Sequence, residues 1–265
     1  LLIGQELFSS LGAGNEEELR WMMSSHYARL AALATDAFRP RALFERYNIE
    51  VIATTERPLD DLRHHQAIRD SGWKGRVITA YRPDPIVDPE FEGFHDNLAV
   101  LAQMTGEDCF NWQGYLNAHR KRRAFFASMG ATSTDHGHPT AQTADLSSQD
   151  AEELFRRVTS AQVTPQDAEL FRAQMLTEMA RMSIDDGLVM QIHPGAFRNH
   201  NAQVFAQFGR DKGADMPSRT EYVQALKPLL DRFGIGKLAK SLAITLSGGE
   251  KRRLAIARSL CSDPT

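Results

Sequence analysis

The sequence predicts an α/β fold: a partial (β/α)8 TIM barrel with parallel strands and helical insertions, followed by a short helical C-terminal tail. Two observations support this prediction. Short β-rich runs alternate with segments of helical periodicity, which is typical of parallel strands joined by helices. Polar or ionisable residues end or follow each run, and in a (β/α)8 barrel the side chains at the strand ends converge on the active site. The four runs are Ile49–Thr55, Arg76–Tyr81, Ala131–Asp135 and Leu188–His193.

The segments between these runs carry signals for helices. Residues 114–129 place apolar side chains among basic ones, and Gly130 supplies a stop signal. Thr164 followed by Pro165 predicts a helix start, with threonine as the N-cap and proline in the first turn. The apolar stripe of this second helix comprises Leu170, Phe171, Met175, Leu176 and Met179. Four strands are half of the eight that a closed barrel needs, so only part of a barrel is predicted.

The bulk composition is ordinary for a soluble globular protein. The chain has 265 residues, of which 42% are hydrophobic and 25% charged, and its net charge is −3. This charge gives no reason to expect nucleic acid or a membrane surface as a partner. No apolar run approaches the roughly 20 residues of a membrane span. The two cysteines, Cys109 and Cys261, are far apart and in no metal-like spacing, which fits the cytoplasm.

A dense cluster of ionisable residues follows the third run. Asp135, His136 and His138 lie in the segment TDHGHP. Two histidines spaced in this way can approach one metal ion, with the aspartate as a further ligand or as an orienting group. The alternative is a turn that is stabilised by hydrogen bonds of the aspartate and the histidines. The pattern alone leaves both interpretations open.

A second candidate site follows the fourth run. His193 stands at the strand end, and Arg198 and Asn199 come shortly after it in a loop rich in hydrogen-bond donors. Such donors suit a hydroxylated, anionic ligand. The alternative is a buried histidine bonded to the backbone. The agreement between the strand end and the donor cluster favours the functional interpretation.

The third candidate is the segment YRPDP at the end of the second run. The guanidinium of Arg82 has a planar fork that matches a carboxylate, and the prolines that follow would stiffen the loop around Tyr81 and Arg82. The alternative is a surface ion pair between Arg82 and Asp84, which would contribute little to stability. By contrast, Arg120–Arg123 and His64–His65 lie on predicted helices, where we expect solvated faces.

The chain resembles a known family over residues 36–234. The resemblance runs through FRPRALFERYNIEVIATT, SGWKGRVITAYRPDP, GYLNAHRKRRAFFASMGATSTDHGHPTA and LVMQIHPGAFRNHN. These segments are similar to the uronate (glucuronate) isomerase family, in the amidohydrolase superfamily of (β/α)8 barrels. The resemblance implies interconversion of D-glucuronate with D-fructuronate, and of D-galacturonate with D-tagaturonate. That reaction moves a proton between C2 and C1, so it needs a base, a carbonyl polariser and a clamp for the carboxylate.

The resemblance also implies roles for individual residues. Arg82 corresponds to a substrate-binding arginine, and His193 stands where the superfamily often places a metal ligand. Asp135, His136 and His138 match a family motif without individual roles, and Tyr81 adjoins Arg82 as a candidate active-site residue.

The intact family uses a divalent metal such as zinc. Its strand-one H-x-H pair would lie upstream of Leu1, and its strand-eight aspartate downstream of residue 234. We therefore expect that the chain alone binds no metal, is a truncated and inactive isomerase, and recognises a small uronate sugar; a homo-oligomer is compatible with this.

The last part of the chain has a different character. From residue 236 onward there are six basic and two acidic residues, and the string LSGGEKRRLAIARSL resembles the signature motif of ABC-transporter ATPases. In that family the residues matching Ser247, Gly248 and Gly249 contact the γ-phosphate of ATP.

The sequence has no Walker A motif, because Asp231 stands where its first glycine would be. The expected organisation is an N-terminal helical segment of uncertain origin (1–35), the partial barrel (36–234) and a signature-helix fragment (235–265). The change near residues 234–236 would then mark a chimera.

Overall fold

The computed structural model describes residues 36–160, 163–212 and 215–234. These residues form two compact units. The smaller unit comprises residues 36–52 and 73–76, and the larger unit comprises residues 53–72 and the described residues from 77 to 234. The expected N-terminal segment 1–35 and the tail 235–265 lie outside the described residues, and the expected boundaries at both ends stay predictions.

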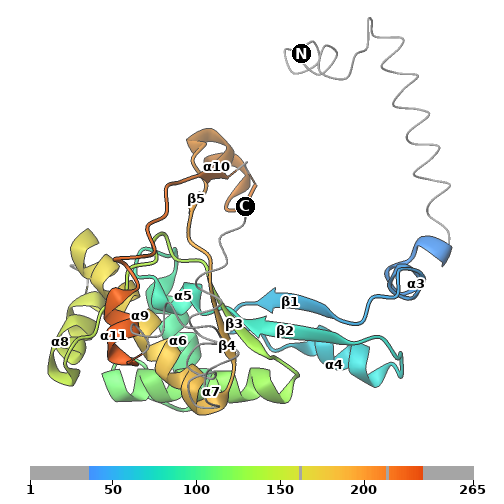
Figure 1. The fold of residues 1–265 in the computed structure, drawn as a ribbon, viewed down its shortest axis with the longest axis horizontal. Helices are drawn as coiled ribbons and strands as arrows, with labels where there is room; N and C mark the ends of the chain where they lie inside the picture. Colours follow the sequence, from blue (N-terminus) through green and yellow to red (C-terminus); the bar gives the residue numbers. More distant parts are fainter. Residues whose placement is uncertain (1–35, 161–162, 213–214, 235–265) are drawn as a thin grey trace, which may run out of the picture. The chain divides into compact units, whose positions relative to one another are not determined.

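The described chain alternates strands and helices, as Figure 1 shows. In chain order the elements are η1 (Asp36–Phe38), α3 (Pro40–Arg46), β1 (Ile52–Glu56), α4 (Arg63–Asp70), β2 (Val77–Tyr81), α5 (Asp84–Val87), α6 (Phe94–Thr105), α7 (Trp112–Ser128), β3 (Ser133–His136), α8 (Ser148–Val158), α9 (Pro165–Asp186), β4 (Val189–Ile192), β5 (Ala196–Phe197), α10 (Ala202–Phe208), β6 (Met216–Pro217) and α11 (Lys227–Arg232).

The main sheet has four strands in the order β1-β2-β3-β4, which is also their order in the chain. The pairs β2–β3 and β3–β4 are parallel, with Tyr81 opposite Thr134 and His136 opposite Ile192. Helices cross between these strands, α7 packing against β2 and α9 against β4. This is the predicted α/β architecture with four strands of a barrel, and each strand lies within or beside its predicted run.

The two helices predicted with start or stop signals are present. Asn111 caps α7 through a side chain that accepts hydrogen bonds from two backbone N–H groups, and the turn after α7 contains Gly130 at φ +96°. Thr164 caps α9 by accepting from the backbone N–H of Asp167. Of the predicted stripe on α9, all residues are buried except Leu170, which is exposed. The two signals therefore predicted the end of α7 and the start of α9 closely.

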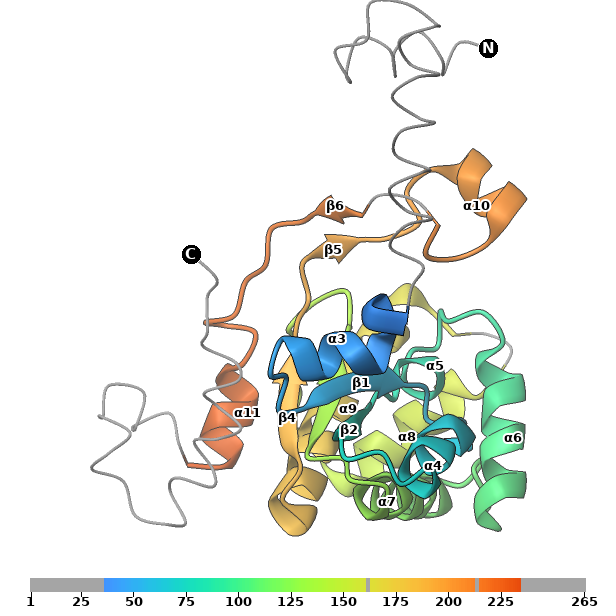
Figure 2. The ribbon, with the colours of Figure 1, turned by 90° about the vertical axis from the view of Figure 1, so that its right-hand side faces the viewer.

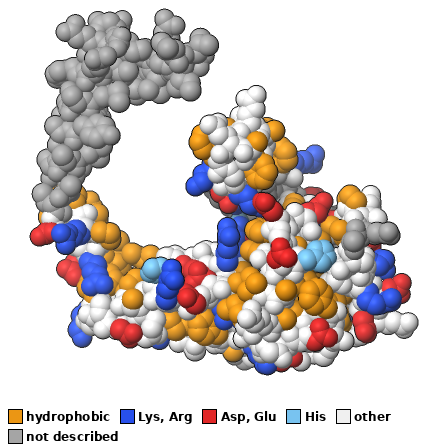
Figure 3. All heavy atoms as spheres, turned by 180° about the vertical axis from the view of Figure 1, so that it is seen from behind, with side chains coloured by type: hydrophobic (Ala, Val, Ile, Leu, Met, Phe, Trp, Pro, Cys, Tyr) orange, Lys and Arg blue, Asp and Glu red, His pale blue; other side chains and the backbone are white. Residues whose placement is uncertain are grey.

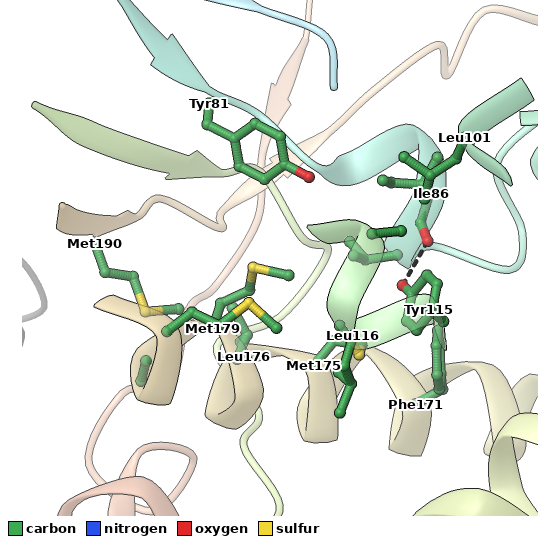
Figure 4. Packing of buried hydrophobic residues seen from close by; sticks show 14 of the residues in the cluster. Tyr81, Ile86, Leu101, Tyr115, Leu116, Phe171, Met175, Leu176, Met179 and Met190 are labelled. Carbon is green, nitrogen blue, oxygen red and sulfur yellow. Dashed lines mark hydrogen bonds between the residues drawn. The ribbon is translucent and has the colours of Figure 1, made fainter. Parts of the chain in front are cut away.

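The core of the larger unit is built where α7, α8 and α9 meet. The rings of Tyr115 and Phe155 stack with centroids 4.8 Å apart, and Phe171 joins them from α9. Figure 4 shows Met175, Leu176 and Met179 of α9 extending this packing toward the sheet. The Tyr115 hydroxyl donates to the Ile86 carbonyl at 2.7 Å. This dense layer fixes α5 and β2 relative to the helices, and with them the residues that follow β2.

The smaller unit has its own aromatic contact. The Phe44 ring of α3 meets the Trp73 ring edge-on at 4.9 Å, and the Trp73 indole N–H donates to Glu45. Arg41 lies over the same indole. These contacts hold α3 against residues 73–76.

An excursion, comprising residues 196–212 and 215–217, leaves the sheet after β4. Its strands β5 and β6 form a short antiparallel ribbon with α10 at the far end, as Figures 1 and 2 show. Asn201 caps α10 with its side-chain oxygen. Hydrophobic side chains lie on the surface around α10 in Figure 3, and Phe205, Phe208 and Met216 are exposed. The excursion carries Arg198 and Arg210, which line a cavity together with Arg82.

Candidate functional site

The candidate site lies at the C-terminal ends of the parallel strands. Arg82 follows β2, Asp135 is the last but one residue of β3 and His193 follows β4. Because Tyr81 pairs with Thr134 and Asp135 with Gln191, these strands end at the same edge of the sheet. The predicted convergence of the strand ends is therefore present for Arg82, Asp135 and His193.

A cavity of about 200 Å³ opens beside Arg82. It is lined by four arginines, three aspartates and four other residues: Arg57, Arg82, Arg198, Arg210, Asp84, Asp88, Asp211, Thr55, Pro85, Phe91 and Gly137. The cations come from three places in the sequence: the end of β1, the end of β2 and the excursion. We call this cavity the arginine pocket. Its four guanidinium groups suit an anionic ligand with hydrogen-bonding groups.

Arg82 is held on two sides by carboxylates. Its Nε donates to Asp84 Oδ2 at 2.7 Å, and its Nη1 lies 3.6 Å from Asp135 Oδ2. Burial opposes the charge, but the pairs with Asp84 and Asp135 raise the pKa of Arg82 above its usual value. The Arg82–Asp84 pair that the sequence left as an alternative therefore exists, although it is partly buried and lines the pocket.

Asp135 links Arg82 to His193. The His193 Nε2 lies 2.7 Å from Asp135 Oδ1, while the other carboxylate oxygen faces Arg82. The His193 side chain is 43% exposed, so the predicted alternative of a buried histidine does not describe it. The order Arg82–Asp135–His193 forms a chain of polar contacts across three neighbouring strand ends.

Arg198 and Asn199 have different surroundings. Arg198 lines the pocket, with its guanidinium 3.6 Å from Asp211 and 3.9 Å from Asp215. The Asn199 side chain instead accepts from the backbone N–H of Asp211 at 2.8 Å, and Asn199 has a left-handed backbone with φ 54°. In this structure Asn199 shapes the loop that carries Asp211, and Arg198 faces the pocket.

Tyr81, His136 and His138 are buried and do not line the arginine pocket. The Tyr81 hydroxyl is hydrogen-bonded to His119 Nδ1 at 2.8 Å, and burial raises the pKa of Tyr81. His136 bonds to the Thr134 hydroxyl, and burial lowers the pKa of both His136 and His138. The strand therefore sends Asp135 toward Arg82 and His136 into the interior, as the alternation of side chains along a strand requires.

One expectation about α7 was wrong. Arg120 is exposed as expected, but Arg122 and Arg123 are buried. Arg123 donates to both carboxylate oxygens of Asp186, at 2.6 and 2.9 Å, and Arg122 donates to the carbonyls of Pro58 and Asp60. The physical reason is that α7 is covered on more than one side, so its basic residues tie it to α9 and to the loop after β1.

Sequence reasoning also missed Arg57, Arg210 and Gly137 as pocket residues. Arg57 directly follows β1, so the strand-end rule applied to the first run could have found it. Arg210 lies with its guanidinium carbon 4.3 Å from the Phe91 ring centroid, a contact between distant parts of the sequence that no local pattern signals. In the sequence, Gly137 indicates only a turn.

Residues 36–160, 163–212 and 215–234 contain no group of three or more histidine, cysteine or carboxylate side chains that could hold a metal ion. His193 and Asp135 contact each other directly, so they do not converge on a shared cation. The described residues therefore form no metal-ligand set. The expectation that this chain binds no metal stays a prediction.

Two further expectations concern the tail and the membrane. Ser247, Gly248 and Gly249 lie outside the described residues. Within the described part of the chain, no helix is long and apolar enough to span a bilayer.

The fold and site define a class of protein: part of a (β/α) barrel with an arginine-rich pocket at its strand ends. A family model described as glucuronate isomerase matches residues 23–261. The chain therefore belongs to the glucuronate isomerase family.

Relatives agree with this assignment. The chain is 69% identical over 215 residues to a uronate isomerase of Phenylobacterium zucineum, covering 81% of this chain and 45% of the relative. It is 69% identical over 214 residues to one of Sphingopyxis alaskensis, covering 79% of this chain and 46% of the relative. The chain thus spans less than half the length of these relatives.

Solved structures give the same picture. The structure of glucuronate isomerase from Caulobacter crescentus matches with a TM-score of 0.74 and 64% identity, over 77% of this chain and 43% of that one. Uronate isomerase from Thermotoga maritima matches with a TM-score of 0.69 at 24% identity, over 73% of this chain and 44% of that one, which supports the fold alone.

Proposed function

We propose that this chain carries the carboxylate-binding side of a uronate isomerase active site. The reaction is the aldose–ketose interconversion of D-glucuronate with D-fructuronate and of D-galacturonate with D-tagaturonate. The observation that carries the proposal is the arginine pocket at the strand ends, combined with membership of the family. A uronate differs from a neutral hexose by its carboxylate, so recognition needs a fixed cation.

Arg82 is the cation best suited to this role. Asp84 occupies its Nε and Asp135 faces its Nη1, which orients the guanidinium plane while leaving donors for a ligand. Arg57 and Arg210 add positive charge to the lining. His193 is held by Asp135 and is partly exposed, which supports a role in contacting sugar hydroxyls.

The first prediction concerns ligand selectivity. The purified chain is expected to bind D-glucuronate and not D-glucose, measured by isothermal titration calorimetry. Arg82→Lys keeps the charge but removes the planar fork, so it should weaken glucuronate binding about 10- to 100-fold, which corresponds to about 1.5–3 kcal/mol.

The control is Arg69→Lys, because Arg69 is exposed on α4 outside the pocket. It should leave binding unchanged. Equal affinity for the two sugars, or an Arg82→Lys variant that binds as well as the wild type, would contradict the proposal.

We also propose that this chain alone does not turn over a uronate. The reason is that the family's catalytic base has no counterpart among the residues that the resemblance identifies. Incubating the chain with D-glucuronate and zinc, followed by detection of ketose, tests it. Accumulation of D-fructuronate would show that the chain is active by itself and would contradict this proposal. We also propose that the chain is cytoplasmic and that it self-associates. Size-exclusion chromatography with light scattering measures the self-association.

The alternative proposal rests on residues 235–265 alone: a fragment of an ABC-transporter ATP-binding subunit fused near residues 234–236. The observation that favours it is the string LSGGEKRRLAIARSL. If it is right, labelling with a photoreactive ATP analogue should depend on Ser247, and Ser247→Ala should abolish it. Absence of labelling would leave the isomerase interpretation alone.

A further inference from the structure

Gly137 lies so close to the guanidinium of Arg82 that a larger residue would displace it. A Cβ at this position would overlap Arg82 Nη2, and it would lie 3.0 Å from Asp84 Oδ2 and 3.2 Å from Arg82 Cζ. The backbone of Gly137 is not in the left-handed region, so its conformation is open to other residues. The glycine is therefore needed for space and not for a turn.

Asp84 holds the same guanidinium from another side. Its carboxylate accepts from Arg82 Nε at 2.7 Å and from the backbone N–H of Gly137 at 3.2 Å. One carboxylate thus ties the loop after β2 to the loop after β3. The Asp84 side chain is only 13% exposed, which strengthens both charge-assisted hydrogen bonds relative to a surface pair.

A third contact completes the surroundings of Arg82. Asp135 Oδ2 lies 3.6 Å from Nη1, and His193 holds Asp135 through its other oxygen. The guanidinium is therefore held at Nε by Asp84, faced at Nη1 by Asp135 and covered at Nη2 by the bare backbone of Gly137. We call Asp84, Asp135 and Gly137 the guanidinium seat.

We propose that Gly137 and Asp84 are positioning residues, which fix the guanidinium plane of Arg82 and thereby set the preference of the pocket for an acidic sugar over a neutral one. The identity of the ligand in this inference rests on the proposed function. The existence of the guanidinium seat does not, because the seat is defined by contacts within the chain.

The guanidinium seat predicts a specific effect of Gly137→Ala on the position of the Arg82 guanidinium. The atom that the new methyl group meets is the far end of a flexible side chain, so the chain can still fold while the guanidinium swings away. The guanidinium would then lose its bond with Asp84. We expect a loss of ligand binding without a loss of folding, which a merely structural glycine would not produce.

The experiment follows the Nε–H signal of Arg82 by ¹H–¹⁵N NMR without ligand, with the signal assigned from its absence in Arg82→Lys. In the wild type, the bond to Asp84 should slow exchange of this proton with solvent. Gly137→Ala and Asp84→Asn should each shift the signal or broaden it away. Asp70→Asn is the control, since Asp70 is exposed on α4 and accepts from Gln66.

The second readout is the Kd for D-glucuronate. Gly137→Ala should weaken binding about tenfold in the wild-type background, as expected when one charge-assisted hydrogen bond is misplaced. In the Arg82→Lys background it should have no further effect, because lysine has no Nη2 for the methyl group to displace. Thermal melting of Gly137→Ala should remain a single cooperative transition, which would show that the variant is folded.

An unchanged Arg82 signal in Gly137→Ala would overturn the proposal, as would equal weakening in both backgrounds. If the wild-type chain binds no glucuronate, the proposed function fails. The Nε–H signal then still decides whether the seat exists.

Discussion

At the scale of single residues, burial and partner choice decide which titratable groups serve the pocket. Arg82 and Asp135 face each other at the strand ends and are not fully enclosed, whereas His119 and His136 are. Neighbouring residues on β3 therefore have different surroundings. Asp135 orients the pocket arginine and His136 is part of the core, although both belong to the same sequence motif.

His119 leads to a prediction about pH. Burial, together with Arg123 and Arg120, lowers the pKa of His119 to about 3, while in the unfolded chain it is about 6.5. Between these values the unfolded state binds one more proton, so stability is complete above about pH 6.5 and falls as the pH falls toward about 3. The slope from this group is about 1.4 kcal/mol per pH unit.

Urea unfolding of the wild type and of His119→Gln at several pH values between about 4.5 and 7 measures this slope. Glutamine keeps a side chain that can hydrogen-bond to Tyr81 but does not titrate. The variant should lose stability more gradually with falling pH, by about 1.4 kcal/mol per unit. Parallel curves for the two proteins would show that His119 is not held neutral by the fold.

At the scale of elements, local signals predicted the end of α7, the start of α9 and most of the buried stripe of α9, but not the burial of the basic residues of α7. The pair Thr164-Pro165 marks the start of α9 because a cap and a proline act within one turn. The basic face of α7 could not be interpreted in the same way. Arg123 is paired with Asp186, which is 63 residues away in the sequence, and no local periodicity indicates that contact.

The Arg123–Asp186 pair gives a prediction about stability. Arg123 is fully buried, and it also donates to Ser183 at 3.0 Å, so the fork joins α7 to the end of α9. Asp186→Asn leaves a buried guanidinium without its counter-charge and should cost about 3–5 kcal/mol in the free energy of unfolding.

Glu153→Gln is the matched control, because Glu153 pairs with Arg157 on the exposed surface of α8. It should cost less than about 1 kcal/mol. Chemical denaturation measures both variants. A similar small effect from the two changes would mean that the Arg123 pair does not hold the helices together.

Most of the sheet could be predicted from the sequence because each strand is a local β-rich run, and consecutive parallel strands tend to lie side by side. The β5–β6 ribbon could not, since its strands, Ala196–Phe197 and Met216–Pro217, are too short to show alternation. Arg210 could not be found either, because its contact with Phe91 joins distant parts of the sequence. Of the residues that line the arginine pocket, the sequence singled out Arg82 and Arg198 and missed Arg57, Arg210 and Gly137. The roles of Arg82, Asp135, His193 and Arg198 stay predictions.

At the scale of the whole molecule, the larger unit carries one part of a barrel with its strand ends. The strands place Arg57, Arg82 and Asp135 at one edge of the sheet, and the excursion adds Arg198 and Arg210. The relatives are more than twice as long as the part that this chain matches. The proposed function is therefore binding and not complete catalysis: we propose that this part of the barrel holds the carboxylate of a uronate.

The most direct test of that claim is a crystal structure of the chain soaked with D-glucuronate. The account predicts electron density for the sugar in the arginine pocket, with its carboxylate within hydrogen-bond distance of the Arg82 guanidinium and with Asp84 still bonded to Arg82 Nε. Density elsewhere on the molecule, or a sugar in the pocket whose carboxylate points away from Arg82, would contradict it.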